Sequence, residues 1–100
     1  MFTGKSLHEL SSLLEKKETS ASEIAADFLK RSGELNPRIN AYITIDADRT
    51  MAEAKASDER RAAGKARSSF DGVPVAVKDN ICTQGMLTTC ASRILRNFVS

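Results

Sequence analysis

The first forty residues repeat apolar positions with the period of an amphipathic helix. Two Ser-x-x-Glu segments, at 6–9 and 20–23, each precede such a pattern, and this spacing is the capping box with which many helices begin. The apolar faces are formed by Leu7, Leu10 and Leu14 with Leu13 beside them, and then by Ile24, Phe28 and Leu35 flanked by Ala25 and Leu29. We expect the two faces to pack together as a helical hairpin, an arm over residues 1–38.

The pattern changes at Asn36-Pro37. The residue before a proline avoids helical dihedral angles, so the second helix is predicted to end there. The next segment, INAYITI at 39–45, alternates apolar and polar residues, which predicts a half-buried strand. Residues 46–63 are rich in Ala, Glu, Lys and Arg and predict a third helix with a solvated face, ended by Gly64.

The segment DGVPVAVKDN, at 71–80, predicts a second strand that ends in charged residues. Its valines would face one way and Lys78 the other. Lysine at a strand end is commonly solvated, yet α/β sheets bind ligands at this end of their strands. A buried lysine has a lowered pKa and, once neutral, can take a proton from a serine. The strand pattern leaves both interpretations open, and the strand–helix–strand order predicts an α/β fold with further strands outside this chain.

Composition narrows the class of protein. The chain has 100 residues and a formal charge of +2, from 15 basic and 13 acidic side chains. This balance gives no electrostatic footprint for nucleic acid or an anionic membrane. Hydrophobic residues make up 41% of the chain, enough for a modest core. No apolar signal region begins the sequence and no segment could span a bilayer, so the cytoplasm is expected.

Other residues offer alternative chemistry. Without a secretory signal, Cys82 and Cys90 are expected to be free thiols, and a reactive thiol would need a nearby histidine or helix amino terminus. The one histidine, His8, is expected on the surface, and no His-containing metal cluster can form. The run DERRAAGKAR at 58–67 begins with acids, which favours a solvated helix end over an RNA-contacting patch.

The segment FDGVPVAVKDNICTQGMLTTCASRIL, at 70–95, resembles the amidase signature family. The family pattern Leu-x-Gly-Val/Ile-Pro-x-x-Val-Lys-Asp is matched from Gly72 to Asp79, with Phe70 in place of the usual leucine. The stretch 80–92, together with LNPRINAYI at 35–43, is most similar to the A subunits of amidotransferases that act on glutamyl-tRNA(Gln).

This resemblance implies a fold and a catalytic group. The fold would be a mixed sheet flanked by helices, with its start in 39–100 and incomplete at the carboxyl end. Lys78 would be the base of a Ser–cis-Ser–Lys triad. Both serines are expected in a later Gly/Ser-rich segment, so Ser92 is not interpreted as the nucleophile and the chain alone is expected to be inactive.

The resemblance also implies a substrate and partners. Glutamine would be hydrolysed without a cofactor or metal in this subunit, and its ammonia would pass to a B subunit that uses ATP and Mg²⁺ to amidate Glu-tRNA(Gln). A small C subunit would hold the two together. Two alternatives stay open. One is another amidase-signature hydrolase with a different amide substrate, and the other is a non-catalytic helical interaction module in which Lys78 is a solvated strand end.

Overall fold

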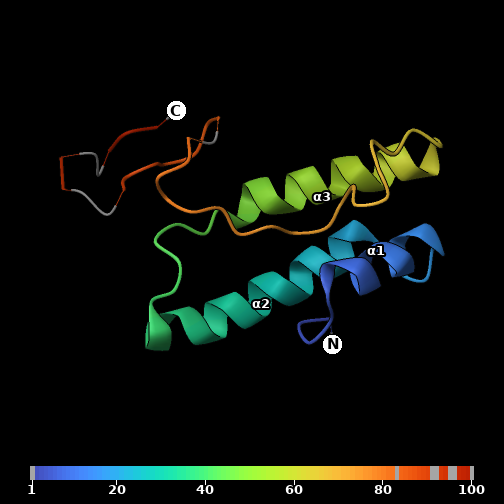
Figure 1. The fold of residues 1–100 in the computed structure, drawn as a ribbon, viewed down its shortest axis with the longest axis horizontal. Helices are drawn as coiled ribbons and strands as arrows, with labels where there is room; N and C mark the ends of the chain where they lie inside the picture. The colour runs from blue at the N-terminus through green and yellow to red at the C-terminus, as the bar shows by residue number, and fades with distance from the viewer. Residues whose placement is uncertain (1, 83, 91–92, 95–96, 100) are drawn as a thin grey trace.

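In the part of the chain that it describes, the computed structural model contains three helices and a long carboxyl-terminal segment (Figure 1). The structure describes residues 2–82, 84–90, 93–94 and 97–99. The helices are α1 (Leu7–Glu15), α2 (Ala21–Ile39) and α3 (Ala47–Ala62). Helices α2 and α3 lie side by side and run in opposite directions, α1 lies beside the beginning of α2, and the segment after Gly72 runs between α2 and α3 (Figure 1).

Side chains at the helix starts bind the backbone N–H groups that have no partner inside a helix. In α1 the predicted capping box is complete: Glu9 N donates to Ser6 Oγ at 3.1 Å, and Ser6 N donates to Glu9 Oε1 at 3.3 Å. In α2, Ser20 Oγ accepts from Glu23 N at 3.1 Å. The Glu23 carboxylate accepts instead from the Thr19 hydroxyl at 2.9 Å, so only the serine half of the second box is confirmed.

A small apolar core joins the three helices. Its buried members are Phe2, Leu10, Leu14, Ala21, Ile24, Ala25 and Ala54. Leu10 and Leu14 come from α1 and Ile24 from α2, which confirms the predicted packing of the two apolar faces, although Leu7 is half exposed. Val73 packs on the same core from the carboxyl-terminal segment.

The second helix passes through its predicted stop and ends at Ile39. Pro37 lies in the last turn, where its missing N–H removes a helical hydrogen bond only near the end. Asn40, with a φ of +50°, supplies the left-handed residue that ends the helix, and its N–H donates to Asn36 O at 2.7 Å. The predicted end at Asn36-Pro37 is wrong because this cap follows three residues later.

Residues 40–46 form a connector, so the strand predicted over 39–45 is wrong. The Asn36 side chain holds this connector: its Nδ2 donates to Tyr42 O at 3.0 Å, and Tyr42 N donates to its Oδ1 at 2.8 Å. These bonds occupy the backbone groups that a neighbouring strand would need, and the described residues provide no such strand. Ile43 is therefore exposed rather than half-buried.

The segment 73–78 is extended, but it pairs with no strand in the part of the chain that the structure describes. Val73 is half-buried, whereas Val75 and Val77 are 76% and 53% exposed. Among the described residues the sheet-like pairing is an isolated bridge between Leu87 and Val99. The strands of the predicted α/β fold are therefore not formed within the described residues, because an extended segment becomes a strand only beside a partner, and the mixed sheet stays a prediction.

The third helix is confirmed. It was expected over 46–63 and occupies Ala47–Ala62, with Asp46 as its cap and Gly64 following it at a φ of +70°. Helix α3 packs on α2, and the division into an arm at 1–38 and a second unit at 39–100 stays a prediction. None of the described helices is long and apolar enough to cross a membrane.

Candidate functional site

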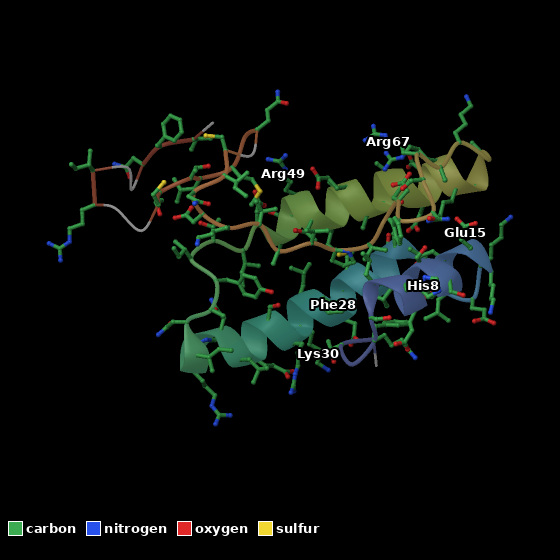
Figure 2. All side chains as sticks on the ribbon, viewed as in Figure 1. His8, Glu15, Phe28, Lys30, Arg49 and Arg67 are labelled. Atoms are coloured by element: carbon green, nitrogen blue, oxygen red, sulfur yellow. The ribbon has the colours of Figure 1, made fainter. Side chains whose placement is uncertain are left out.

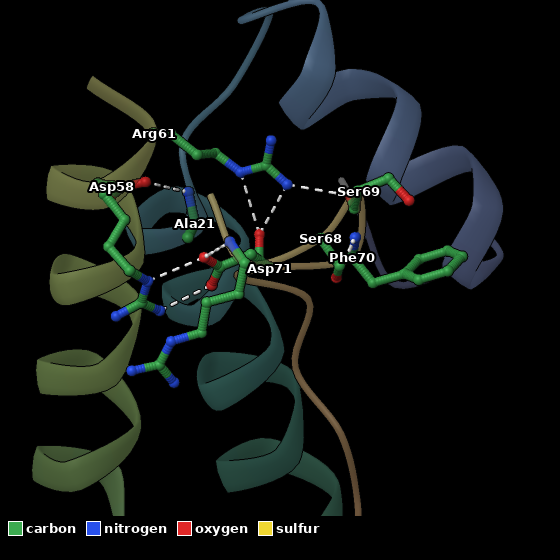
Figure 3. A network of polar contacts seen from close by, with 9 residues as sticks. Ala21, Asp58, Arg61, Ser68, Ser69, Phe70 and Asp71 are labelled. Carbon is green, nitrogen blue, oxygen red and sulfur yellow. Dashed lines mark hydrogen bonds and ion pairs between the residues drawn. The ribbon is translucent and has the colours of Figure 1, made fainter. Parts of the chain in front are cut away.

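Two arginines in the last turn of α3 bind the loop that leads to Lys78 (Figure 3). Arg60 Nε and Nη2 donate to Asp71 Oδ2 and Oδ1 at 2.8 and 2.7 Å, and the Asp71 side chain is 5% exposed. Arg67 N also donates to Asp71 Oδ2, at 3.0 Å. Arg61 donates to the Asp71 carbonyl oxygen through Nε at 3.0 Å and Nη2 at 2.8 Å. We call Arg60, Arg61 and Asp71 the arginine latch.

The arginine latch also reaches α1. Arg61 Nη2 donates to Ser69 O at 3.0 Å, and its Nη1 pairs with Glu15 Oε1 at 3.0 Å. The hydroxyl of Ser11, a buried residue of α1, donates to the same Ser69 oxygen at 2.6 Å. The solvated helix end predicted over 58–67 is confirmed only in part: Glu59 and residues 62–67 are exposed, whereas Arg60 and Arg61 are half-buried and bind partners within the chain.

Asp58, in the same run, caps the neighbouring helix α2. Its Oδ1 accepts from Ala21 N at 2.7 Å, and its Oδ2 accepts from Ser22 N at 3.1 Å and Ser22 Oγ at 2.6 Å. A carboxylate at a helix amino terminus is favoured, since the helix dipole is positive there. Asp58 thus fixes α3 to the start of α2.

Gly72 follows the latch with its backbone against both helices. Its φ is +100°, a conformation that side-chain-bearing residues rarely adopt. A Cβ atom at this position would lie 2.6 Å from Ser57 Oγ and 2.8 Å from Ala21 Cβ. The loop backbone therefore packs directly on α2 and α3.

The arginine latch changes the acid–base behaviour of Asp71. Hydrogen bonds from Arg60 hold the pKa of the Asp71 carboxyl well below its ordinary 3.8, although burial acts in the opposite direction. A carboxyl whose pKa is lower in the folded than in the unfolded state stabilises the fold at pH values above its unfolded pKa. This contribution is lost as the pH falls below about 4.

We expect Asp71→Asn to flatten the acid dependence of stability. At pH 7 the variant should unfold at a lower urea concentration than the parent chain, because Arg60 loses its charged partner. Between pH 7 and pH 3 its urea midpoint should then fall less, since the variant has no carboxylate at position 71 to protonate. Glu59→Gln, an exposed carboxyl of α3, is the matched control and should keep the parental acid dependence. An equal fall in the parent chain and Asp71→Asn would contradict this prediction.

Lys78 lies between two fixed points. Its side chain is exposed and borders a broad open groove lined by α2, α3 and residues 71–81. The neighbouring Asp79 accepts from Thr89 N at 2.8 Å and from the Thr89 hydroxyl, and its carbonyl oxygen accepts from Cys90 N at 3.1 Å. Thr89 is buried. The segment is therefore held at Asp71 on one side of Lys78 and at Asp79 on the other.

Of the remaining candidates, Cys90 contacts this arrangement through its backbone N–H. Cys82 and Cys90 are free, as predicted, and both are exposed. His8 is exposed on α1, as predicted (Figure 2). Ser92 lies outside the described residues. Within the described residues, no cluster of three or more His, Cys, Asp or Glu side chains could hold a metal ion.

Sequence reasoning missed the residues that hold the loops on α3. Arg49, labelled in Figure 2, donates to the Gln84 carbonyl oxygen and pairs with Glu53 at 3.1 Å. Together with the arginine latch, it ties the carboxyl-terminal segment to both ends of α3. The signal available in the sequence was the pair of adjacent arginines at the predicted helix end.

Comparison with known proteins gives consistent matches. Residues 23–100 match the family described as Amidase. A Pelobacter propionicus protein, named as the A subunit of glutamyl-tRNA(Gln) amidotransferase, is 53% identical over 93 residues, which are 93% of this chain and 19% of the relative. Proteins of the same name from Neisseria gonorrhoeae and Synechococcus elongatus are 51% and 48% identical over 98% and 94% of this chain, each match covering 20% of the relative. The chain thus spans about a fifth of the length of these relatives.

Proposed function

Because this chain belongs to the amidase family, we propose that it is the Lys78-bearing part of the glutamine-hydrolysing subunit of a glutamyl-tRNA(Gln) amidotransferase. The observation that carries the proposal is the identity of about half the residues, over nearly the whole chain, with relatives that bear this name. The family motif from Gly72 to Asp79 supports it, since it places a lysine where the family has its base.

In the proposed reaction Lys78 is the general base. Its neutral amine takes a proton, through a bridging serine, from a second serine that attacks the amide carbonyl of glutamine. Ammonia leaves, and water hydrolyses the acyl-enzyme to glutamate. We place both serines in a part of the complete subunit outside this chain. Lys78 is exposed here, so the desolvation that lowers a lysine pKa would have to come from that part as well.

The ammonia would serve a second reaction on a partner. A B subunit would activate the γ-carboxyl of glutamate on Glu-tRNA(Gln) with ATP and Mg²⁺, and ammonia would convert the product to Gln-tRNA(Gln) for protein synthesis. A C subunit would hold the other two subunits together. The support is the relatives' name, which designates one subunit of an amidotransferase. We propose that glutamine hydrolysis in this subunit uses amino-acid side chains, without a cofactor or metal ion.

Substrate choice tests the proposed function. The complete subunit, in complex with its partners, should release ammonia and glutamate from glutamine in equal amounts. Its kcat/KM for glutamine should exceed that for a simple amide such as propionamide by about 100-fold or more, because a site built for glutamine leaves polar groups unpaired with the smaller amide. Preference for the simple amide would favour another amidase-signature hydrolase. Absence of any amide hydrolysis would favour the helical interaction module.

A further inference from the structure

We infer that Arg60, Arg61 and Asp71 are positioning residues, which set where the Lys78 segment leaves the helices and hence where the Lys78 amine is presented. This inference rests on the proposed function for its catalytic consequence. Its structural part stands on the contacts of the arginine latch alone.

The arginine latch holds Asp71 by both its side chain and its backbone. The Asp71 carboxylate accepts two hydrogen bonds from Arg60, in bidentate geometry, and a third from Arg67 N. Its carbonyl oxygen accepts two hydrogen bonds from Arg61. Paired, parallel hydrogen bonds from a guanidinium fix the orientation of a carboxylate as well as its distance. The carboxylate and the carbonyl oxygen of Asp71 are therefore both bound to the last turn of α3, which fixes the loop at this residue.

The chain is held less firmly after Val73 than at Asp71. Gly72 packs on Ser57 and Ala21, and Val73 N donates to Phe70 O at 3.1 Å. After Val73 the chain is extended as far as Lys78, and the side chains of residues 75–78 are exposed. The position of Lys78 therefore depends on the arginine latch on its amino-terminal side, and on the contacts of Asp79 on the other.

A register error in this segment would displace the Lys78 amine by a large distance. A slip of one residue moves an extended chain by about 3.3 Å and turns each side chain to the opposite side. Misplacement of a catalytic group by about 1 Å can already cost about 100-fold in rate. Removing one partner of the Arg60–Asp71 pair leaves the other charge unpaired and also costs stability, so the effect of the arginine latch on the position of Lys78 has to be measured per folded molecule.

Kinetics of the complete subunit test the inference. Arg60→Ala and Asp71→Ala should each lower kcat for glutamine hydrolysis by about tenfold or more per folded molecule, with KM within about twofold, because neither side chain binds substrate. The double variant should be no slower than the slower single variant, since the two side chains act as one unit. Arg60→Lys, which keeps the charge but loses the fork, should restore kcat in part.

The control and a second readout separate positioning from folding. Lys55→Ala removes an exposed cation from the same helix and should leave kcat unchanged. Amide hydrogen exchange at positions 71 and 73, whose N–H groups donate to Ser68 O and Phe70 O, should rise at least tenfold in Arg60→Ala and Asp71→Ala of the complete subunit, with α2 still protected. Unchanged exchange, or a kcat per folded molecule within twofold of the parent, would overturn the inference. A parent subunit without glutamine hydrolysis would instead overturn the proposed function, and the exchange measurement would still test the latch.

Discussion

Gly72→Ala should lower the free energy of unfolding by about 3 kcal/mol. We expect no larger loss of stability from the addition of one methyl group elsewhere in this chain. A φ of +100° strains a residue that carries a Cβ by about 1–3 kcal/mol. The new methyl group would also overlap Ser57 Oγ and Ala21 Cβ, and overpacking costs about 1–3 kcal/mol more. Neither neighbour is the far end of a long side chain, so relief requires movement of the loop away from the helices.

The chain contains its own control for this substitution. Gly33 lies inside α2, and a Cβ atom there would meet nothing within 4 Å. Gly33→Ala should raise stability by about 0.5–1 kcal/mol, because alanine loses less backbone freedom than glycine on entering a helix. Urea unfolding of both variants gives the comparison. A loss below about 1 kcal/mol for Gly72→Ala would show that the loop does not pack on α2 and α3 as described.

Lys78→Ala should have the largest effect on activity. If the Lys78 amine is the base that activates the nucleophilic serine, its removal should lower kcat for glutamine hydrolysis in the complete subunit by about 10³-fold. KM should change little, since the lysine is not proposed to bind glutamine.

Lys55→Ala is the matched control for this loss of a cation, because Lys55 is also exposed but lies on the helix α3. It should keep the parental rate. Thermal unfolding of both variants checks that the fold is retained, which we expect because the Lys78 side chain is exposed. A rate for Lys78→Ala within tenfold of the parent would contradict the assignment of the base.

The helices could be predicted from the sequence because their determinants are local. Ser6 and Glu9 are three residues apart and bind each other, and the apolar residues of α1 and α2 repeat with the period of the helix that they form. The strands could not be predicted in this way. Residues 39–45 and 73–78 have strand-like patterns, but a strand also needs a neighbour, and the Asn36 side chain takes the backbone groups of Tyr42 instead.

The candidate site was predictable only where its residues are contiguous. The family motif places Lys78 and Asp79 together in one short segment. The arginine latch joins Arg60 to Asp71 across eleven positions and a loop, and spacing alone does not show which acid an arginine at a helix end will bind. Gly72 looked like an ordinary motif glycine, and only the three-dimensional packing shows that Ser57 and Ala21 exclude a side chain there.

The most direct test of the account is the rate of glutamine hydrolysis by the complete subunit carrying Lys78→Arg. Arginine keeps a long, positively charged side chain at this position but does not give up its proton in proteins. If Lys78 works as a proton acceptor, ammonia release by Lys78→Arg should be as low as that of Lys78→Ala. A rate near that of the parent would show that positive charge alone is needed at position 78, and would contradict the role of Lys78 as the general base.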